Sequence, residues 1–271
     1  MCVVHALTST QTVCMMSADP NSFEAIRPKL TAQTLQDIEG LDPQKYGFGR
    51  EECCGPIPTK IIGSMSLREH IFLNTRMPAR EWDKRTENVP GFKELSQRVK
   101  HALPDASFTV SHLDQDTEDS ILHCKVDDDK KAVIITQYSS VSEPYELPWE
   151  VKGTLAVDRS GEYFIFVCSH FTRDARCGYC GSVLIDLFRH ALLEKMGAGG
   201  TARVTVCSCS HVGGHVYAGN VIIYSRHGGI CYGLFKPEDV LPVVDAIAED
   251  KGAIPESLRN RIRGQMGSNA S

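Results

Sequence analysis

The sequence predicts an α/β protein built in two parts, and three observations support this prediction. Apolar residues at helical spacing mark one helix in each half of the chain, at 90–103 and at 180–196. Short runs rich in β-branched and aromatic residues precede and follow each helix. A stretch rich in Pro and Ser that lacks any periodicity, residues 139–153, separates the two halves.

The chain is expected to divide into four segments. Prolines interrupt the first, and a single short helix is predicted there, near residues 31–39. The last segment is polar and basic and is expected to lie on the surface. The segments are an irregular N-terminal stretch at 1–65, a smaller α/β domain at 66–145, a second α/β domain at 155–255 and the polar tail at 256–271.

The smaller domain is predicted to contain one helix and four strands. Its helix begins at Pro90, a residue that suits the first turn, and Phe92, Leu95 and Val99 lie on one face. The predicted strands are 69–75, 107–112, 121–126 and 131–136.

The second domain shows clearer signals. A buried strand at 162–167 precedes the helix at 180–196, which ends near a group of glycines. A strand at 202–206 and a hairpin formed by 220–225 and 230–235 follow, and Pro237 opens a last helix that reaches about residue 250. The resulting order, β-α-β-β-β-α, is compatible with a thioredoxin-like half. The smaller domain could repeat that architecture.

Composition and charge exclude several classes of protein. The 271 residues carry a net charge of −5 with a pI near 6.1, which argues against a nucleic-acid partner. No apolar run is long enough to predict a membrane span. The N-terminus lacks the pattern of a signal peptide and is poor in arginine. We expect a cytoplasmic protein, with the mitochondrial matrix as the alternative.

Cysteine and histidine are concentrated in the second domain. Six of the eleven cysteines lie between residues 168 and 231. In a reducing compartment such residues are free thiols, metal ligands or catalytic groups. Seven potential metal ligands or redox thiols lie in one stretch: Cys168, Cys177, Cys180, Cys207, Cys209, His211 and His215.

Four of these residues are expected to meet at one end of the sheet. Cys168 ends a predicted strand, and Cys177 lies just before a predicted helix, whose positive N-terminal end favours thiolates and anionic groups. His211 and His215 follow the next strand in a turn that contains Gly213 and Gly214.

The order, spacing and residues of these motifs resemble those of one known family. Cys168 and Cys177 are separated by eight residues, and after 33 more residues come two histidines separated by three. Around them stand Arg173-Asp-Ala-Arg176, His211-Val-Gly-Gly-His215, Tyr217-Ala-Gly-Asn220 and Arg263-Gly-Gln-Met-Gly267. Together these motifs resemble the sucrase/ferredoxin-like family, strongly over residues 160–267 and faintly over 69–82.

The resemblance implies a function. The family's C-terminal domain is a thioredoxin-like ferredoxin with a 2Fe–2S cluster, held by two Cys on one iron and two His on the other. The implied ligands here are Cys168, Cys177, His211 and His215. The implied activity is one-electron transfer to or from a protein redox partner, coupled to protons through the imidazoles, and not catalysis on a substrate of its own. The adjacent Cys53 and Cys54, and Ile262 in place of an aromatic residue, depart from the family's pattern.

Other interpretations stay open. Cys177-Gly-Tyr-Cys180 is typical of a thiol–disulfide oxidoreductase, although residues 216–220 lack the proline expected in such folds and the histidines would have no role. A structural zinc site could use Cys177, Cys180, Cys207 or Cys209 together with a histidine. A scaffold subunit of a larger assembly is a third interpretation. Arg173, Asp174 and Arg176 fit either a docking surface or a loop ion pair that supports Cys177.

Overall fold

The structure is a computed structural model. It describes residues 19–113, 118–127, 129, 131–139, 141 and 145–267, with only the backbone at Cys54 and His215. No helix among these residues is both long enough and apolar enough to cross a membrane.

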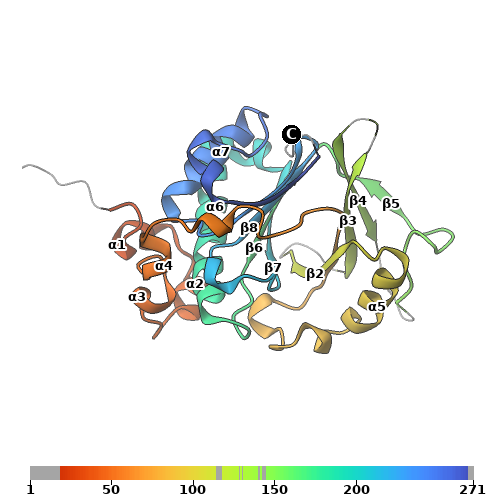
Figure 1. Cartoon of the computed structure of the whole chain (residues 1–271), viewed down its shortest axis with the longest axis horizontal. Coiled ribbons are helices and arrows are strands. Elements are labelled where there is room, and N and C mark those ends of the chain that lie inside the picture. The colour runs from red at the N-terminus through yellow and green to blue at the C-terminus, as the bar shows by residue number, and fades with distance from the viewer. Residues whose placement is uncertain are drawn as a thin grey trace, which may run out of the picture.

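One mixed sheet of ten strands runs through the described chain (Figure 1). Its order is β10-β9-β8-β6-β7-β2-β1-β3-β4-β5. The strands are β1 (His70–Asn74), β2 (Ser107–His112), β3 (Ser120–Asp127), β4 (Ala132–Ser139), β5 (Ala156–Asp158), β6 (Tyr163–Cys168), β7 (Val204–Cys209), β8 (Val221–Ser225), β9 (Gly228–Tyr232) and β10 (Ile262–Met266).

The two halves of the sheet share one topology. In the N-terminal half β1 pairs with β2 in parallel and with β3 antiparallel, and β4 then adds to β3. In the C-terminal half β6 pairs in the same way with β7 and β8, and β9 adds to β8. A helix connects the parallel pair in each half. The halves join through β2 and β7, which pair at Ser111 with Cys209 and at His112 with Ser208.

The sheet folds over on itself at this junction. The ring of Phe72 on β1 stacks on that of Phe166 on β6, with 3.8 Å between centroids and 3° between planes. Two strands separate β1 from β6, and a flat sheet would hold them about 14 Å apart at 4.7–4.9 Å per strand spacing. An apolar core that includes Leu122, Val133, Phe164 and Ile222 fills the space between the two half-sheets.

Helices cover the outer faces of the halves (Figure 1). Helix α5 (Phe92–Ala102) packs on the N-terminal half through Leu95 and Val99. Helices α6 (Ala175–Thr201) and α7 (Val240–Ala248) pack on the C-terminal half. Short helices from the N-terminal segment share the α6 core; they are α1 (Phe23–Ile26), α2 (Ala32–Asp37), α3 (Pro43–Tyr46) and α4 (Glu51–Cys54).

The structure confirms the predicted β-α-β-β-β-α order of the C-terminal half, the four N-terminal strands and the short helix near 31–39. Helix α6 begins at Ala175, five residues earlier than predicted, because Asp174 caps it by accepting a hydrogen bond from the Arg176 N–H. It ends at Thr201 beyond a kink at Gly197, where φ is 66°.

The prediction of a surface tail was wrong for residues 262–266. These residues form β10, which pairs antiparallel with β9 and is mostly buried. Its side chains alternate polar and apolar too weakly for the sequence pattern to indicate a strand. Arg263, which the sequence analysis placed on the surface, is 2% exposed.

Two glycines allow α6 to lie against the end of β6. A Cβ atom at Gly181 would stand 2.4 Å from the Cys168 carbonyl oxygen and 2.7 Å from the Ser169 Cα. A Cβ atom at Gly178 would stand 2.2 Å from the Phe171 ring. No larger residue fits at either position unless the helix moves away from the strand.

A buried polar group links the half-sheets. The ring of His70 lies between the Tyr224 hydroxyl, 2.8 Å from Nδ1, and the Thr109 hydroxyl, 2.7 Å from Nε2. Complete burial lowers the pKa of His70 to about 3. The imidazole is therefore neutral in the folded protein at every pH above that value.

Replacing Gly181 by Ala should destabilise the protein by about 1–3 kcal/mol, because the added methyl group overlaps backbone atoms that cannot move freely. Urea unfolding of the purified variant measures this. Gly199→Ala, in the same helix, is the matched control, since nothing lies within 4 Å of the added atom. A Gly181→Ala protein as stable as the Gly199→Ala protein would contradict the close helix–strand contact.

His70 predicts a pH dependence of stability. Its pKa is about 3 when folded against an ordinary 6.5, so the unfolded chain binds one more proton between these values. Stability from His70 is fully present above pH 6.5 and is lost as the pH falls toward 3. In His70→Gln the slope of unfolding free energy against pH, measured from pH 6 to 4, should be smaller by up to ~1.4 kcal/mol per pH unit.

The exposed His101→Gln substitution should leave that slope unchanged. Equal slopes in the His70 and His101 variants would show that His70 titrates normally.

Candidate metal centre

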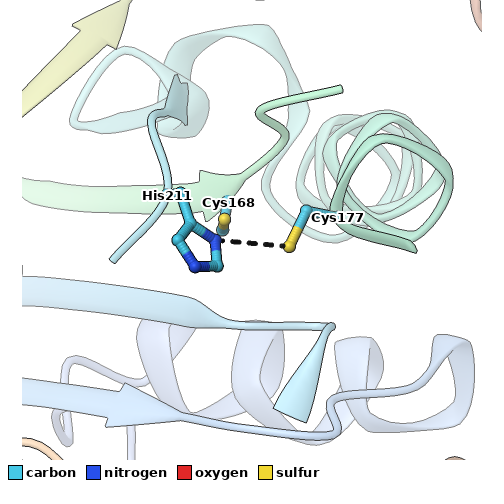
Figure 2. Close-up of side chains that lie close together, drawn as sticks. All are labelled: Cys168, Cys177 and His211. Carbon is cyan, nitrogen blue, oxygen red and sulfur yellow. Dashed lines mark hydrogen bonds between the residues drawn. The ribbon is translucent and has the colours of Figure 1, made fainter. Parts of the chain in front are cut away.

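Three predicted ligands meet at one end of the C-terminal half-sheet (Figure 2). Cys168 is the last residue of β6, Cys177 lies in the first turn of α6, and His211 follows β7 by two residues. Their ligand atoms all lie within 4.8 Å of one another, and 3.8 Å separates the Cys177 Sγ from the His211 Nδ1. Both thiols are fully buried and free, whereas His211 is half-buried.

Parallel pairing explains why these segments meet. In the register of β6 and β7, Cys168 lies opposite Cys209, so both strands end at the same edge of the sheet. The Cys168 N–H donates to the Asn220 carbonyl at 3.0 Å, and the Ser169 N–H donates to the Cys209 carbonyl at 3.1 Å. These bonds fix the first ligand between the strands on either side of it.

The start of α6 places the second ligand. Asp174 accepts from the Arg176 N–H at 2.9 Å and forms an ion pair with the Arg176 guanidinium at 3.0 Å. This agrees with the predicted loop ion pair that supports Cys177. The N-terminal end of a helix is electropositive, so the position favours a thiolate at Cys177.

One of the two thiols loses its proton readily, and the other resists losing it. The hydrogen bond with Cys177, assisted by His211, holds the pKa of Cys168 well below its usual range. The same bond with Cys168, together with burial, raises the pKa of the Cys177 thiol well above its usual range. A second negative charge therefore forms in this site only if a cation arrives to balance it, which is how metal binding releases protons from thiols.

His170 positions the third ligand. Its Nδ1 accepts from the His211 backbone N–H at 3.4 Å, and its Nε2 donates to the Asp83 carbonyl at 2.9 Å. Burial lowers the pKa of His170, so the ring stays neutral and can accept at Nδ1. Its edge-on contact with Trp82 completes the packing.

We call residues 210–220 the histidine loop, because it carries His211 and His215. Gly213 and Gly214 have φ values of 78° and 66°, which an L side chain rarely adopts. The His215 side chain lies outside the described atoms; its backbone opens a 3-10 turn, His215–Tyr217. The assignment of His215 as a ligand stays a prediction.

Two buried arginines, which sequence reasoning missed as functional groups, bind this loop. Arg263 donates to the Gly213 carbonyl at 3.1 Å and to the Asn220 side-chain oxygen at 2.6 Å. Arg50 donates to the Ala218 carbonyl. The motif Arg263-Gly-Gln-Met-Gly267 was a signal for the first; nothing in the sequence around Arg50 indicated the second.

The remaining cysteines lie outside the triad. Cys180 accepts from the Arg50 guanidinium at 3.0 Å and lies 3.6 Å from the Tyr46 carbonyl. Burial is the main cause that raises the pKa of its thiol. Cys207 and Cys209 are buried in the core between the half-sheets, as packing thiols would be. Among the described side chains, only Cys168, Cys177 and His211 form a group of metal-ligand geometry.

Two side chains that flank Cys168, those of Ser169 and Asn220, each have a buried polar atom with no partner among the described residues. The side-chain amide nitrogen of Asn220 is fully buried and makes no hydrogen bond, while the backbone carbonyl of the same residue binds Cys168. A buried donor left unpaired costs roughly 1–3 kcal/mol. An anionic group in the site that accepts this N–H would remove that cost.

Comparisons with known proteins agree with the motifs. A family model described as Sucrase/ferredoxin-like matches residues 61–260. "Altered inheritance of mitochondria protein 32" of Debaryomyces hansenii is 32% identical over 136 residues, which are 47% of this chain and 48% of that protein.

Two further relatives give similar values. The protein of the same name from Meyerozyma guilliermondii is 35% identical over 101 residues, covering 37% of this chain and 35% of that protein. "Actin patches distal protein 1" of Saccharomyces cerevisiae is 33% identical over 120 residues, covering 41% and 38%. In each comparison the chain spans less than half the length of the relative.

No solved structure matches the chain. The family match covers well over half of the 271 residues and includes Cys168, Cys177 and the histidine loop. The chain therefore belongs to the sucrase/ferredoxin-like family.

Proposed function

We propose that this protein is a one-electron carrier that holds a 2Fe–2S cluster through Cys168, Cys177, His211 and His215. The observation that carries the proposal is the convergence of the first three residues, whose ligand atoms lie within 4.8 Å of one another. Two free buried thiols beside a half-buried imidazole form a donor set suited to a metal–sulfur centre.

The surroundings of the triad fit such a group. The raised pKa of the Cys177 thiol means that its ionisation is favoured by a bound cation, which is the usual coupling of metal binding to thiol deprotonation. The unpartnered Asn220 amide is a donor of the kind that hydrogen-bonds to cluster sulfur and tunes its potential. When bound, the cluster supplies a reversible one-electron couple.

Mixed ligation sets the properties of the carrier. Replacing two thiolates by imidazoles reduces the negative charge, and Rieske centres with the same ligand types span about −150 to +300 mV. Imidazole ligands in general keep an ionisable N–H, so reduction of such a centre is proposed to be coupled to proton uptake.

Each half of the sheet is proposed to be a thioredoxin-like unit, since both show the same strand order and the same connecting helix. In the N-terminal half Asn74 lies opposite Ser111, as Cys168 lies opposite Cys209 in the C-terminal half. Asn74 forms hydrogen bonds to Ser111 and Ser120. The N-terminal unit thus carries an amide where the C-terminal unit carries a ligand.

The contacts of Cys180 disfavour the dithiol alternative. Its sulfur contacts Arg50 and Tyr46 of the N-terminal segment, whereas the Cys177 sulfur contacts His211.

The structural zinc alternative uses Cys177, Cys180, Cys207 or Cys209 with a histidine, and of these cysteines only Cys177 belongs to the described group of metal-ligand geometry. A zinc ion bound by Cys168, Cys177 and His211 is the form of that alternative that the geometry allows. Measuring the iron, sulfide and zinc content of the purified protein distinguishes a zinc site or a scaffold role from a 2Fe–2S electron carrier.

A protein redox partner is proposed to approach the half-buried edge of His211, near the exposed side chain of Arg173. The names of two of the relatives refer to the inheritance of mitochondria, and on that basis a mitochondrial association is proposed beside the cytoplasmic one. The ligands proposed for the cluster are the same whichever partner and compartment apply.

Anaerobically purified protein should be coloured and contain two iron and two sulfide ions per chain, the content of a 2Fe–2S cluster. Cys168→Ala and Cys177→Ala should each abolish the colour, because each removes a thiolate. Cys207→Ala, a buried cysteine outside the triad, should retain it. A colourless wild-type protein that contains zinc would overturn the proposal.

Exchanging an imidazole for a thiolate should lower the reduction potential. His211→Cys and His215→Cys each add negative charge at the metal, which disfavours the reduced state, and each removes an ionisable group. Spectroelectrochemistry from pH 6 to 9 measures both effects. His101→Gln serves as a control that removes an exposed imidazole outside the triad. A potential and pH slope unaltered in His215→Cys would exclude that residue as a ligand.

A further inference from the structure

Two fully buried positive charges lie next to the candidate metal centre. Arg50 and Arg263 are each 2% exposed, and both donate hydrogen bonds to the histidine loop. Neither residue is a ligand. Residue 50 belongs to the N-terminal helical segment and residue 263 to β10, so the fold brings together two distant parts of the chain here.

Arg263 is connected to ligands on two sides. It holds the Gly213 carbonyl, two residues from both His211 and His215, and it holds the Asn220 side chain. The backbone of Asn220 in turn accepts from the Cys168 N–H. The Tyr217 ring lies 5.1 Å from the guanidinium, and Ser64 accepts from Nε at 3.1 Å.

Arg50 precedes α4 and contacts the site through α6. It donates to Cys180, one turn after Cys177 and about 4.5 Å further along the helix at 1.5 Å per residue. It also donates to the carbonyls of Gly47 and Ala218. Its Nε has no hydrogen-bond partner among the described residues.

Among the described residues these two charges have a single carboxylate partner, and it belongs to Arg50. The half-exposed carboxylate of Glu52 lies 3.9 Å from Arg50, and no carboxylate of the described residues forms an ion pair with Arg263. The Cys180 sulfur accepts from Arg50 at 3.0 Å, and burial raises the pKa of that thiol. The nearby Arg261 shows the usual arrangement, since it pairs directly with the buried Asp239.

Burying an uncompensated charge is unfavourable, and proteins offset this cost by pairing or by metal sites. An electron that enters a cluster at Cys168, Cys177 and the histidines brings one negative charge into the same low-dielectric region. Attraction between opposite charges is strong there and weakly screened by salt.

We propose that Arg50 and Arg263 are charge-compensating positioning residues that favour the reduced state of the cluster and hold the histidine loop in place. The inference rests on the proposed function, since it presumes that the site takes up an electron. It goes further in naming two residues that are not ligands but influence the reduction potential of the cluster. Both act through buried positive charge, so the effect persists at high ionic strength.

The experiment compares reduction potentials of purified, cluster-loaded variants at low salt and at 0.5 M salt, a concentration at which exposed charges are largely screened. Arg50→Gln and Arg263→Gln should each make reduction at least tenfold less favourable, about 59 mV lower for a one-electron couple, at both salt concentrations. Arg50→Lys and Arg263→Lys keep the charge and should recover most of the potential.

Arg173→Gln is the matched control, because it removes an exposed arginine four residues before Cys177. Its effect should disappear at 0.5 M salt, a concentration at which the Debye length is only a few ångströms. A wild-type protein without a cluster contradicts the proposed function itself. A loaded wild type whose Gln variants keep the wild-type potential overturns only the present inference.

Incorporation of the cluster into the variants is a second measurement. If the Gln variants do not load a cluster while the Lys variants load at the wild-type potential, the buried charge is required and the inference is supported. If the Lys variants fail in the same way as the Gln variants, the arginines act through hydrogen-bond geometry alone and charge compensation is wrong.

Discussion

The parallel pairing of β6 with β7 is the constraint on which the site depends. Two parallel strands end at the same edge of a sheet, and the helix that connects them must begin at that edge. Cys168, Cys177 and His211 occupy the end of the first strand, the start of the helix and the residues after the second strand. Residues 43 positions apart therefore meet without any distortion of the regular structure.

Close approach is the second requirement, and glycine provides it. Gly178 and Gly181 bring α6 into contact with the backbone at the end of β6, so the Cys177 thiol reaches the Cys168 thiol. In the histidine loop Gly214 allows Arg263 to lie against the backbone, since a Cβ there would stand 2.6 Å from the guanidinium. The motifs Cys-Gly-Tyr-Cys-Gly and His-Val-Gly-Gly-His thus encode packing as much as ligation.

Much of this arrangement could be predicted from the sequence. Periodicity located α6 and the strands β6 to β9, because each has a continuous buried face. Cys168 could be placed at a strand end, and its approach to Cys177 and His211 followed from the topology. The start of α6 could not be predicted, because Ala175 and Arg176 show no apolar periodicity and the helix cap depends on Asp174 alone.

Other features lie beyond local patterns. Strand β10 contains Arg263, Gly264 and Gln265, a composition typical of an exposed tail, and it becomes a strand only because β9 offers an unpaired edge. The burial of Arg50 depends on carbonyl groups at Gly47 and Ala218, far apart in sequence. The folding of the sheet on itself depends on contacts such as Phe72 with Phe166, which no single segment encodes.

The contacts of the histidine loop also bear on when the cofactor can be inserted during synthesis of the chain. The loop receives hydrogen bonds from residue 50 and from residue 263, which lie on either side of all four proposed ligands in the chain. During synthesis the ligands emerge before residue 263 exists, so the loop cannot yet have its native support. A cofactor delivered to the nascent chain would meet an incomplete site, and we expect maturation to follow translation.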